Sequence, residues 1–303
     1  AYQRCGKLIV AKDASEVPAL DELERRATEN GVPGLRRLTG DQIAEVEPHC
    51  VGEAALHSPN TGIVDFAAVA RAMGDDLRAA GGTVTTGAGV EAIWTTAEGI
   101  GVRHAAGQES ARFLVSCAGL ASDRVAVLAG ADPDPRIVPF RGAYLRLRPD
   151  KRDLVKGLIY PVPDPSLPFL GVHLTLHVDG EVSLGPTALL APRLSSLGWP
   201  GTLRMARRWW RTGLAEMRSA VRTSEFAREA AQYVPELEPG DFSPYFAGYR
   251  AQALGRDGTL VDDFVIHETP NALHVRNAPS PAATSSLAIA DMIASRAREA
   301  LAA

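Results

Sequence analysis

Residues 272–301 read ALHVRNAPSPAATSSLAIADMIASRAREAL, and our interpretation of the fold starts from this stretch. It opens with an alternating run typical of a strand and closes with a run that has helical periodicity. Between them, residues 277–286 combine two prolines with side chains that, apart from Asn277, carry only small methyl or hydroxyl groups. An ordinary connection needs turn residues but has no need to be small throughout. We therefore predict that a large flat ligand lies against this backbone.

The composition narrows the class of protein. The chain has 303 residues, of which 46% are hydrophobic and 22% are charged, so it is long enough for two globular domains. A net charge of −4 argues against a general affinity for nucleic acid. Three widely spaced cysteines indicate a reducing compartment, which we expect to be the cytoplasm, and no zinc site.

The N-terminus predicts neither a signal peptide nor a membrane anchor. It lacks the charged and apolar regions of a leader, and no apolar run in the chain is long enough to span a bilayer. The chain also lacks an initiator Met and enters an apolar, strand-like run, KLIVA, at residues 7–11. We expect the chain to start within a larger protein.

The order of predicted elements indicates a mixed α/β fold. Residues 66–130 have the pattern of a helix, a strand meander, a further strand and a helix. From 138 to 189 the pattern is of strands with tight turns, including an Asp179–Gly180 hairpin. Residues 201–237 are mostly helical, and strands return from 244 before one last helix. Two domains, each built from separated segments, are expected.

One apparent nucleotide-binding motif is rejected on its context. Residues 87–92, GAGVEA, match the G-x-G-x-x-A spelling of a dinucleotide fingerprint. In a working fingerprint the glycines open a helix whose N-terminus receives the pyrophosphate. Here a β-rich run, Ile93 to Thr96, follows instead. We interpret residues 87–92 as a turn between two strands.

Four longer stretches carry a family resemblance: FRGAYLRL (140–147), LIYPVPDPSLPFLGVHLT (158–175), AGYRAQAL (247–254) and NAPSPAATSS (277–286). Together they resemble the L-2-hydroxyglutarate dehydrogenases/oxidases. These belong to a wider FAD-dependent group that includes D-amino-acid oxidase and glycine oxidase. VSCAGLASDR (115–124) is similar to the wider group. The resemblance extends over nearly the whole chain.

The resemblance implies a fold and an activity. The fold would be an FAD/NAD(P)-binding Rossmann-like domain at residues 60–130 plus 244–303, and an antiparallel-sheet substrate domain at 1–59 plus 131–243. The activity would be the FAD-dependent oxidation of L-2-hydroxyglutarate to 2-oxoglutarate, with hydride transfer to flavin. The family begins with a βαβ unit that carries the Gly-rich fingerprint, and we expect these 303 residues to be the family fold without that unit. Two alternatives stay open: an amine oxidase of the glycine or D-amino-acid oxidase kind, and a non-catalytic truncated remnant.

The resemblance also implies the cofactor contacts. Thr284, Ser285 and Ser286 are good N-cap residues, and a helix N-terminus offers unpaired N–H donors and partial positive charge. Such donors would stabilise the negative charge of a reduced flavin. On the residues alone, a capped strand–loop–helix without a ligand is the commoner reading. The predicted FAD contacts are Val90, Ser116, Ala118, Gly119, Asn277, Ala278, Pro279, Ser280, Ala282, Ala283 and Thr284.

Arginines are the predicted carboxylate ligands. Arg250 follows the aromatic residues Tyr245, Phe246 and Tyr249, and the resemblance implies that its guanidinium holds the α-carboxylate of the substrate. Arg141 is a second candidate, because a dicarboxylate needs a positive partner at each end. The alternatives are a surface arginine at a strand end and an ordinary salt bridge. Tyr160 is also placed on the substrate side by the resemblance.

A histidine is the predicted base. His173, Thr175 and His177 alternate with apolar residues, so a strand would place all three on one face. Oxidation of an alcohol requires loss of the hydroxyl proton, which a neutral imidazole can accept. We predict that His173 is this base and that His177 is a solvated hairpin residue. No third ligand has the spacing that a metal site would need.

Residues 203–218, LRMARRWWRTGLAEMR, suggest a partner surface. Apolar residues follow helical spacing and arginines occupy the remaining positions. A basic face beside Trp suits an anionic membrane, and contact with the inner face of the cell membrane would fit transfer of electrons to quinone. Oxygen is the alternative acceptor. The simpler reading is a helix packed on its own domain with solvated arginines.

Overall fold

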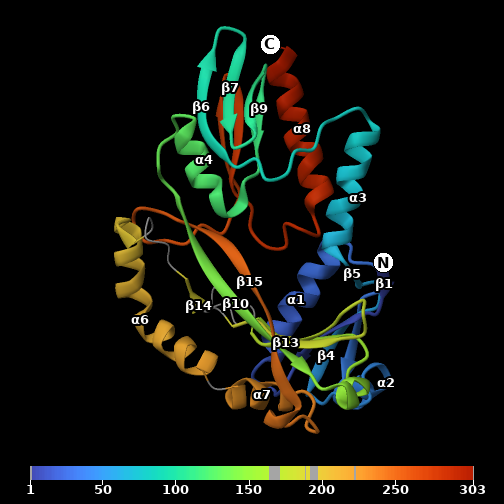
Figure 1. Ribbon diagram of the computed structural model, residues 1–303. Coiled ribbons are helices and arrows are strands. Elements are labelled where there is room, and N and C mark those ends of the chain that lie inside the picture. The colour runs from blue at the N-terminus through green and yellow to red at the C-terminus, as the bar shows by residue number, and fades with distance from the viewer. Residues whose placement is uncertain (1, 164–170, 188, 192–196, 222, 303) are drawn as a thin grey trace. The chain divides into compact units, whose positions relative to one another are not determined.

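The computed structural model describes residues 2–163, 171–187, 189–191, 197–221 and 223–302, shown in Figure 1. The chain divides into two compact units of three segments each. The first unit comprises residues 1–72, 141–189 and 214–248, and the second comprises 73–140, 190–213 and 249–303. We predicted two segments per domain. The division into a cofactor domain and a substrate domain stays a prediction.

The first unit is built on a mostly antiparallel sheet. Its strands follow the order β14-β10-β13-β12-β11-β2-β4-β3, with β15 also paired to β10. The β11–β2 pair is parallel. The bounds are β2 Lys7–Ala11, β3 Arg36–Thr39, β4 Ala54–Ser58, β10 Arg136–Leu147, β11 Leu158–Pro161, β12 His173–Leu176, β13 Val182–Gly185, β14 Leu189–Leu190 and β15 Phe242–Leu254. The strands β10, β14 and β15 continue into the second unit.

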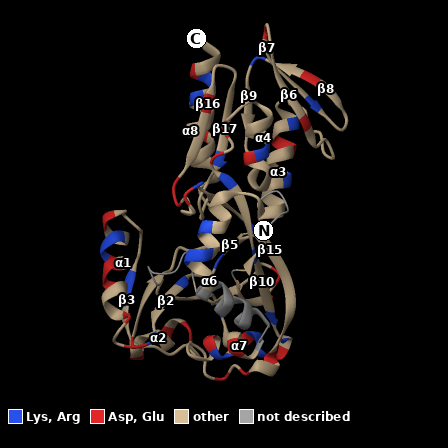
Figure 2. Ribbon diagram, turned by 90° about the vertical axis from the view of Figure 1, so that its left-hand side faces the viewer, with Lys and Arg blue, Asp and Glu red and all other residues tan. Residues whose placement is uncertain are grey.

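Helices and a small ribbon complete the first unit. The helices are α1 Val17–Glu29, α2 Gly40–Val46 and α7 Thr223–Ala231, with short 3-10 turns at Pro149–Leu154 and Pro239–Asp241. A two-stranded sheet pairs β1 Tyr2–Arg4 with β5 Gly62–Val64. Helix α2 begins with a capping box, in which the Thr39 backbone N–H donates to Gln42 Oε1 at 3.0 Å. Helix α1 exposes residues of both charge signs, as Figure 2 shows.

Strand register sorts the side chains of this sheet onto two faces. Leu8, Ile159, Leu174 and Leu184 are direct neighbours across β2, β11, β12 and β13. All four are buried in the main core, where residues of α7 also pack. Burial of each such leucine or isoleucine stabilises the fold by roughly 1.5–3 kcal/mol. The next residues along the strands point to the opposite face, which carries Tyr160 and His173.

The second unit combines two three-stranded sheets with helices. One is an antiparallel meander of β6 Val90–Thr96, β7 Gly99–His104 and β8 Gly107–Ala111. In the other, the central strand β17 Ala272–Asn277 pairs antiparallel with β16 Val265–Thr269 and parallel with β9 Leu114–Ser116. Helix α4 Ser122–Leu128 packs on β17, and α8 Ser286–Ala302 follows it in the chain. Helices α3 Phe66–Ala79 and α6 Pro200–Val221 each have residues in both units.

Most predicted elements are confirmed, with two corrections near the meander. The mixed α/β class, the strand at 7–11, the Asp179–Gly180 hairpin and the last helix are all present. Residues 87–92 are not a turn between two strands, since the segment before Val90 is irregular and Gly87 has φ +70°. The absence of a helix after these glycines confirms that the fingerprint does not apply. The run ESARFLVSCAG at 109–119 has the pattern of one strand but forms parts of two, β8 and β9.

Candidate active site

A cavity lies at the carboxyl ends of two parallel strands in the second unit. Because β9 and β17 are parallel, both end at the same edge of their sheet, which is where ligands bind in open α/β sheets. The cavity has a volume of about 130 Å³. The residues that line it are Cys117, Gly119, Ser122, Ala251, Val275, Arg276, Asn277 and Ala278.

Three predicted cofactor residues are in the wall of this cavity: Gly119, Asn277 and Ala278. Gly119 has φ +51°, and a Cβ built there would meet no atom within 4 Å, so this position leaves space open. Ser116 is buried at the end of β9, and Ala118 lies between two lining residues. Val90, by contrast, begins β6 with 42% of its surface exposed.

Polar groups fix the shape of this wall. The Asn277 amide donates to the Val261 and Asp263 carbonyls at 3.1 and 2.8 Å, so the side chain holds a neighbouring loop. Ser122 Oγ donates to the Arg276 carbonyl at 3.0 Å and ties the start of α4 to β17. The Arg276 guanidinium donates to the carbonyls of Asp134 and Pro135, both at 2.8 Å. These bonds hold Ser122, Arg276 and Asn277 in place around the cavity.

The loop from 278 to 285 connects β17 to α8 and carries the remaining predicted FAD contacts. Pro279 and Ala282 are half-buried, whereas Ser280, Ala283 and Thr284 are exposed. Thr284 Oγ1 donates to the Pro281 carbonyl at 2.8 Å, so this hydroxyl tightens the turn. The Ile289 N–H donates to the Ser285 carbonyl at 3.0 Å, the first helical bond of α8. The loop carries small side chains, and hydrogen bonds tighten its turn before α8 begins.

A stacked aromatic pair lies on the first unit's sheet. His173 on β12 and Tyr160 on β11 have ring centroids 4.0 Å apart and planes 21° apart. His173 is 8% exposed, and its Nδ1 is 3.0 Å from the Gly171 carbonyl oxygen. A carbonyl only accepts, so Nδ1 carries the proton and the lone pair of the neutral imidazole is on Nε2. The tautomer is therefore the one that a base acting through Nε2 requires.

His177 is not the solvated hairpin residue that we predicted. It lies just after β12 ends, is half-buried, and its Nε2 is 2.8 Å from Ser183 Oγ. Its ring meets Tyr245 and Phe246 edge-on, with centroids 6.0 and 6.2 Å apart. Burial lowers the pKa of His177. The aromatic neighbours of His177 lie on β15, which is distant in sequence. The local pattern around residue 177 therefore does not predict its burial.

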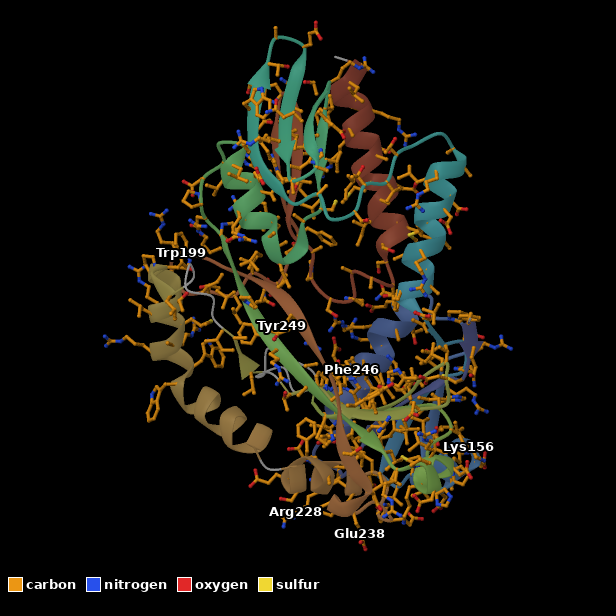
Figure 3. The ribbon with its side chains drawn as sticks, in the orientation of Figure 1. Lys156, Trp199, Arg228, Glu238, Phe246 and Tyr249 are labelled. Atoms are coloured by element: carbon orange, nitrogen blue, oxygen red, sulfur yellow. The ribbon has the colours of Figure 1, made fainter. Side chains whose placement is uncertain are left out.

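The two predicted arginines lie in different units. Arg141 is half-buried on β10 in the first unit, beside Gly142, where an added Cβ would approach Pro186 Cβ to 2.9 Å. Arg250 is half-buried on β15 in the second unit, and its chain neighbour Ala251 lines the cavity. Phe246 and Tyr249 precede Arg250 on the same strand (Figure 3), both more than a third exposed.

The sequence analysis missed one charged residue of the first unit. Lys7 lies on β2 with its ammonium 5.0 Å from the centroid of the Tyr160 ring. Burial lowers the pKa of this ammonium. The available signal was the lysine that opens the strand-like run KLIVA, directly before four apolar residues.

Comparison with known proteins identifies the class of this protein. The family model for FAD dependent oxidoreductases matches residues 1–296. The chain belongs to this FAD-dependent oxidoreductase family.

Sequence relatives are more specific. A mitochondrial L-2-hydroxyglutarate dehydrogenase of Caenorhabditis elegans is 44% identical over 98% of this chain and 74% of its own length. The corresponding Homo sapiens protein is 43% identical over 97% of this chain and 70% of its own. L-2-hydroxyglutarate dehydrogenase of Indibacter alkaliphilus is 40% identical over 95% and 76%.

Solved structures share the fold at lower identity. L-α-glycerophosphate oxidase from Mycoplasma pneumoniae with FAD bound superposes with a TM-score of 0.75, covering 99% of this chain and 72% of that chain at 20% identity. Glycine oxidase from Geobacillus kaustophilus gives a TM-score of 0.63 over 96% and 70%, at 18% identity.

The cavity of the second unit fits part of an FAD molecule. The open space at Gly119 admits close approach of a ligand to backbone, as dinucleotide sites require. About 130 Å³ is smaller than the several hundred typical of whole cofactor pockets, so the cavity has room for only one portion of such a cofactor.

Proposed function

We propose that this protein catalyses the FAD-dependent oxidation of L-2-hydroxyglutarate to 2-oxoglutarate. The proposal rests on one observation above the others: relatives over 40% identical across nearly the whole chain are L-2-hydroxyglutarate dehydrogenases. The cavity at the ends of β9 and β17 and the His173–Tyr160 pair supply groups of the kinds that the reaction needs.

The reaction breaks two bonds of the substrate. The C2–H bond gives up its electron pair as hydride, the hydroxyl O–H gives up a proton, and the C2–O bond becomes a carbonyl. FAD, when bound, supplies the hydride acceptor. The protein must orient the alcohol, hold its carboxylates and take the proton. The acceptor that later reoxidises the flavin is proposed to be quinone or oxygen.

His173 is proposed to take the hydroxyl proton. The donation from Nδ1 to the Gly171 carbonyl leaves the basic lone pair on Nε2, and the stack on Tyr160 fixes the ring plane. Proton transfer by such a positioned base accelerates reactions by about 10²–10⁴-fold. Tyr160 is proposed to contact the substrate from the same sheet face.

Arginines are proposed to hold the carboxylates. Arg250 would bind the carboxylate next to C2, since a guanidinium binds a carboxylate through two parallel N–H donors. Arg141 is the proposed partner of the far carboxylate. Gly119, Asn277 and Ala278 are proposed to hold FAD with Val90, Ser116, Ala118, Pro279, Ser280, Ala282, Ala283 and Thr284.

Steady-state turnover with an artificial electron acceptor tests the function. The purified protein is expected to be yellow and to oxidise L-2-hydroxyglutarate in preference to glycine and D-alanine. Preference for either amino acid would favour the amine oxidase alternative. A colourless preparation without turnover would favour a non-catalytic remnant.

Contact with an anionic membrane is a second proposal, carried by α6. Leu203 and Trp210 are 63% and 57% exposed, and with Ala206 and Arg207 they line one shallow hollow. Arg208 lies over the Trp209 ring at 5.8 Å. Exposed apolar groups beside arginines suit an anionic lipid surface. No helix in the described part of the chain is long and apolar enough to cross a membrane. The fraction of protein that sediments with phosphatidylserine vesicles should fall in the double variant Leu203→Ser, Trp210→Ser. An unchanged fraction would refute the contact.

A further inference from the structure

Lys7 is a half-buried cation without a protein counterion among the described residues. It makes no hydrogen bond or ion pair with any residue in the described part of the chain, and burial alone accounts for its lowered pKa. A nearby carboxylate would have opposed that shift. Charged groups that are shielded from water are normally paired, so this half-buried, unpaired ammonium is available to an external anion.

Lys7 and the proposed base lie on the same face of the sheet. Residue 7 is level with Leu158 on β11, and Tyr160 is level with His173 on the next strand. The ammonium is 5.0 Å from the Tyr160 centroid, which is 4.0 Å from the His173 centroid. The two separations put the ammonium within about 9 Å of the imidazole centroid. A ligand that touches both His173 and Lys7 must therefore be short and anionic.

Along the strands, Arg141 lies further from the level of the His173–Tyr160 pair than Lys7 does. His173 is level with Gly185, and the β10–β13 register makes Tyr144 the residue level with Gly185. Arg141 is three residues further along β10, or about 10 Å at 3.4 Å per residue. Lys7 is only two residues from Ile9, the residue level with Tyr160.

We propose that Lys7 binds the far carboxylate of the substrate and so selects a dicarboxylate over a monocarboxylate. Three carbon–carbon bonds separate C2 of 2-hydroxyglutarate from that carboxylate carbon, a length that fits between the imidazole and the ammonium. The cation–π contact with Tyr160 keeps the ammonium in place when no substrate is bound. This inference rests on the proposed function. It makes Lys7, in addition to Arg141, a residue that selects dicarboxylate substrates.

The test compares Lys7→Met, Arg141→Met and a control, Lys156→Met, in the FAD-loaded protein. Lys156 is an exposed lysine at the entrance to β11 (Figure 3). With L-2-hydroxyglutarate, Lys7→Met is expected to lower kcat/KM by roughly 10- to 100-fold, mostly through KM, as loss of a charge-assisted hydrogen bond predicts. With L-2-hydroxybutyrate, which lacks the second carboxylate, the change is expected to be small. Lys7→Arg should restore part of the loss.

A readout without turnover accompanies the kinetics. Reductive methylation of Lys7, read by mass spectrometry, is expected to be slowed by glutarate and not by butyrate, while that of Lys156 stays unchanged. Equal effects of Lys7→Met and Lys156→Met, or a change of substrate preference in Arg141→Met alone, would overturn the inference. If the wild-type protein does not oxidise L-2-hydroxyglutarate, the proposed function fails, and protection by glutarate still decides whether Lys7 binds a dicarboxylate.

Discussion

At the scale of single residues, hydrogen bonds decide what each side chain can do. His173 and His177 are four positions apart but have different partners, a carbonyl oxygen and a hydroxyl. Only the carbonyl fixes which ring nitrogen is basic, because a serine hydroxyl both donates and accepts. Thus His173 and His177, which share one face in the sequence pattern, differ in the proposed reaction. His173 is the proposed base, and His177 has no proposed role.

Replacement of His173 tests this assignment. In His173→Gln, kcat should fall by about 10²–10⁴-fold, because the base is lost. His177→Gln is the matched control and should change kcat by much less. Both variants should keep the flavin absorbance of the wild type. The pH dependence of kcat/KM below neutrality should flatten only in His173→Gln. Equal losses in the two variants, or an unchanged pH profile, would contradict the role of His173.

At the scale of elements, the ends of β9 and β17 form the proposed cofactor cavity because these strands are parallel. An antiparallel pair would have placed the turn after Ser116 and the loop after Asn277 at opposite edges. The turn after β9 then contributes Gly119, whose positive φ lets the backbone face the cavity without a side chain. This arrangement depends on pairing between residues more than 150 positions apart.

Gly119→Ala tests whether this turn holds the cofactor. Gly119 and Gly130 both have positive φ, and neither has an atom within 4 Å of an added Cβ, so alanine causes similar backbone strain at both. Only Gly119 lines the cavity. The Kd for FAD, measured by flavin fluorescence, should rise about tenfold or more in Gly119→Ala, equivalent to at least 1.4 kcal/mol. If Gly130→Ala weakens FAD binding as much, backbone strain explains the loss and the cavity does not.

At the scale of the whole molecule, the local pattern predicts elements but not their neighbours. The strand at 7–11 and the helix at 286–302 follow from periodicity and turn residues, and the FAD contacts were assigned by family resemblance. Lys7 was not predicted as a site residue, because its position near Tyr160 depends on the parallel pairing of β2 with β11. No local pattern reveals that pairing. His177 was misjudged for the same reason, since its aromatic neighbours come from β15. Side-chain roles that depend on long-range pairing needed the structure.

A buried histidine predicts how stability depends on pH. His274 is 1% exposed on β17, neither ring nitrogen has a hydrogen-bond partner among the described residues, and burial lowers its pKa, helped by His267 and Arg276. The unfolded chain, with a histidine pKa of about 6.5, therefore binds the proton more readily. Stability is present above pH 6.5 and is lost as the pH falls below it. In His274→Leu the thermal midpoint should fall less between pH 7.5 and 5.5 than in the wild type, and equal falls would contradict this.

The central claim is that this protein oxidises a 2-hydroxy diacid by hydride transfer to FAD. The most direct measurement is anaerobic mixing of the FAD-loaded protein with substrate, followed by the absorbance of oxidised flavin. L-2-Hydroxyglutarate is expected to bleach the flavin and form 2-oxoglutarate in equal amount, while D-2-hydroxyglutarate and glycine leave it oxidised. A flavin that stays oxidised with L-2-hydroxyglutarate, or that glycine reduces faster, would contradict the account.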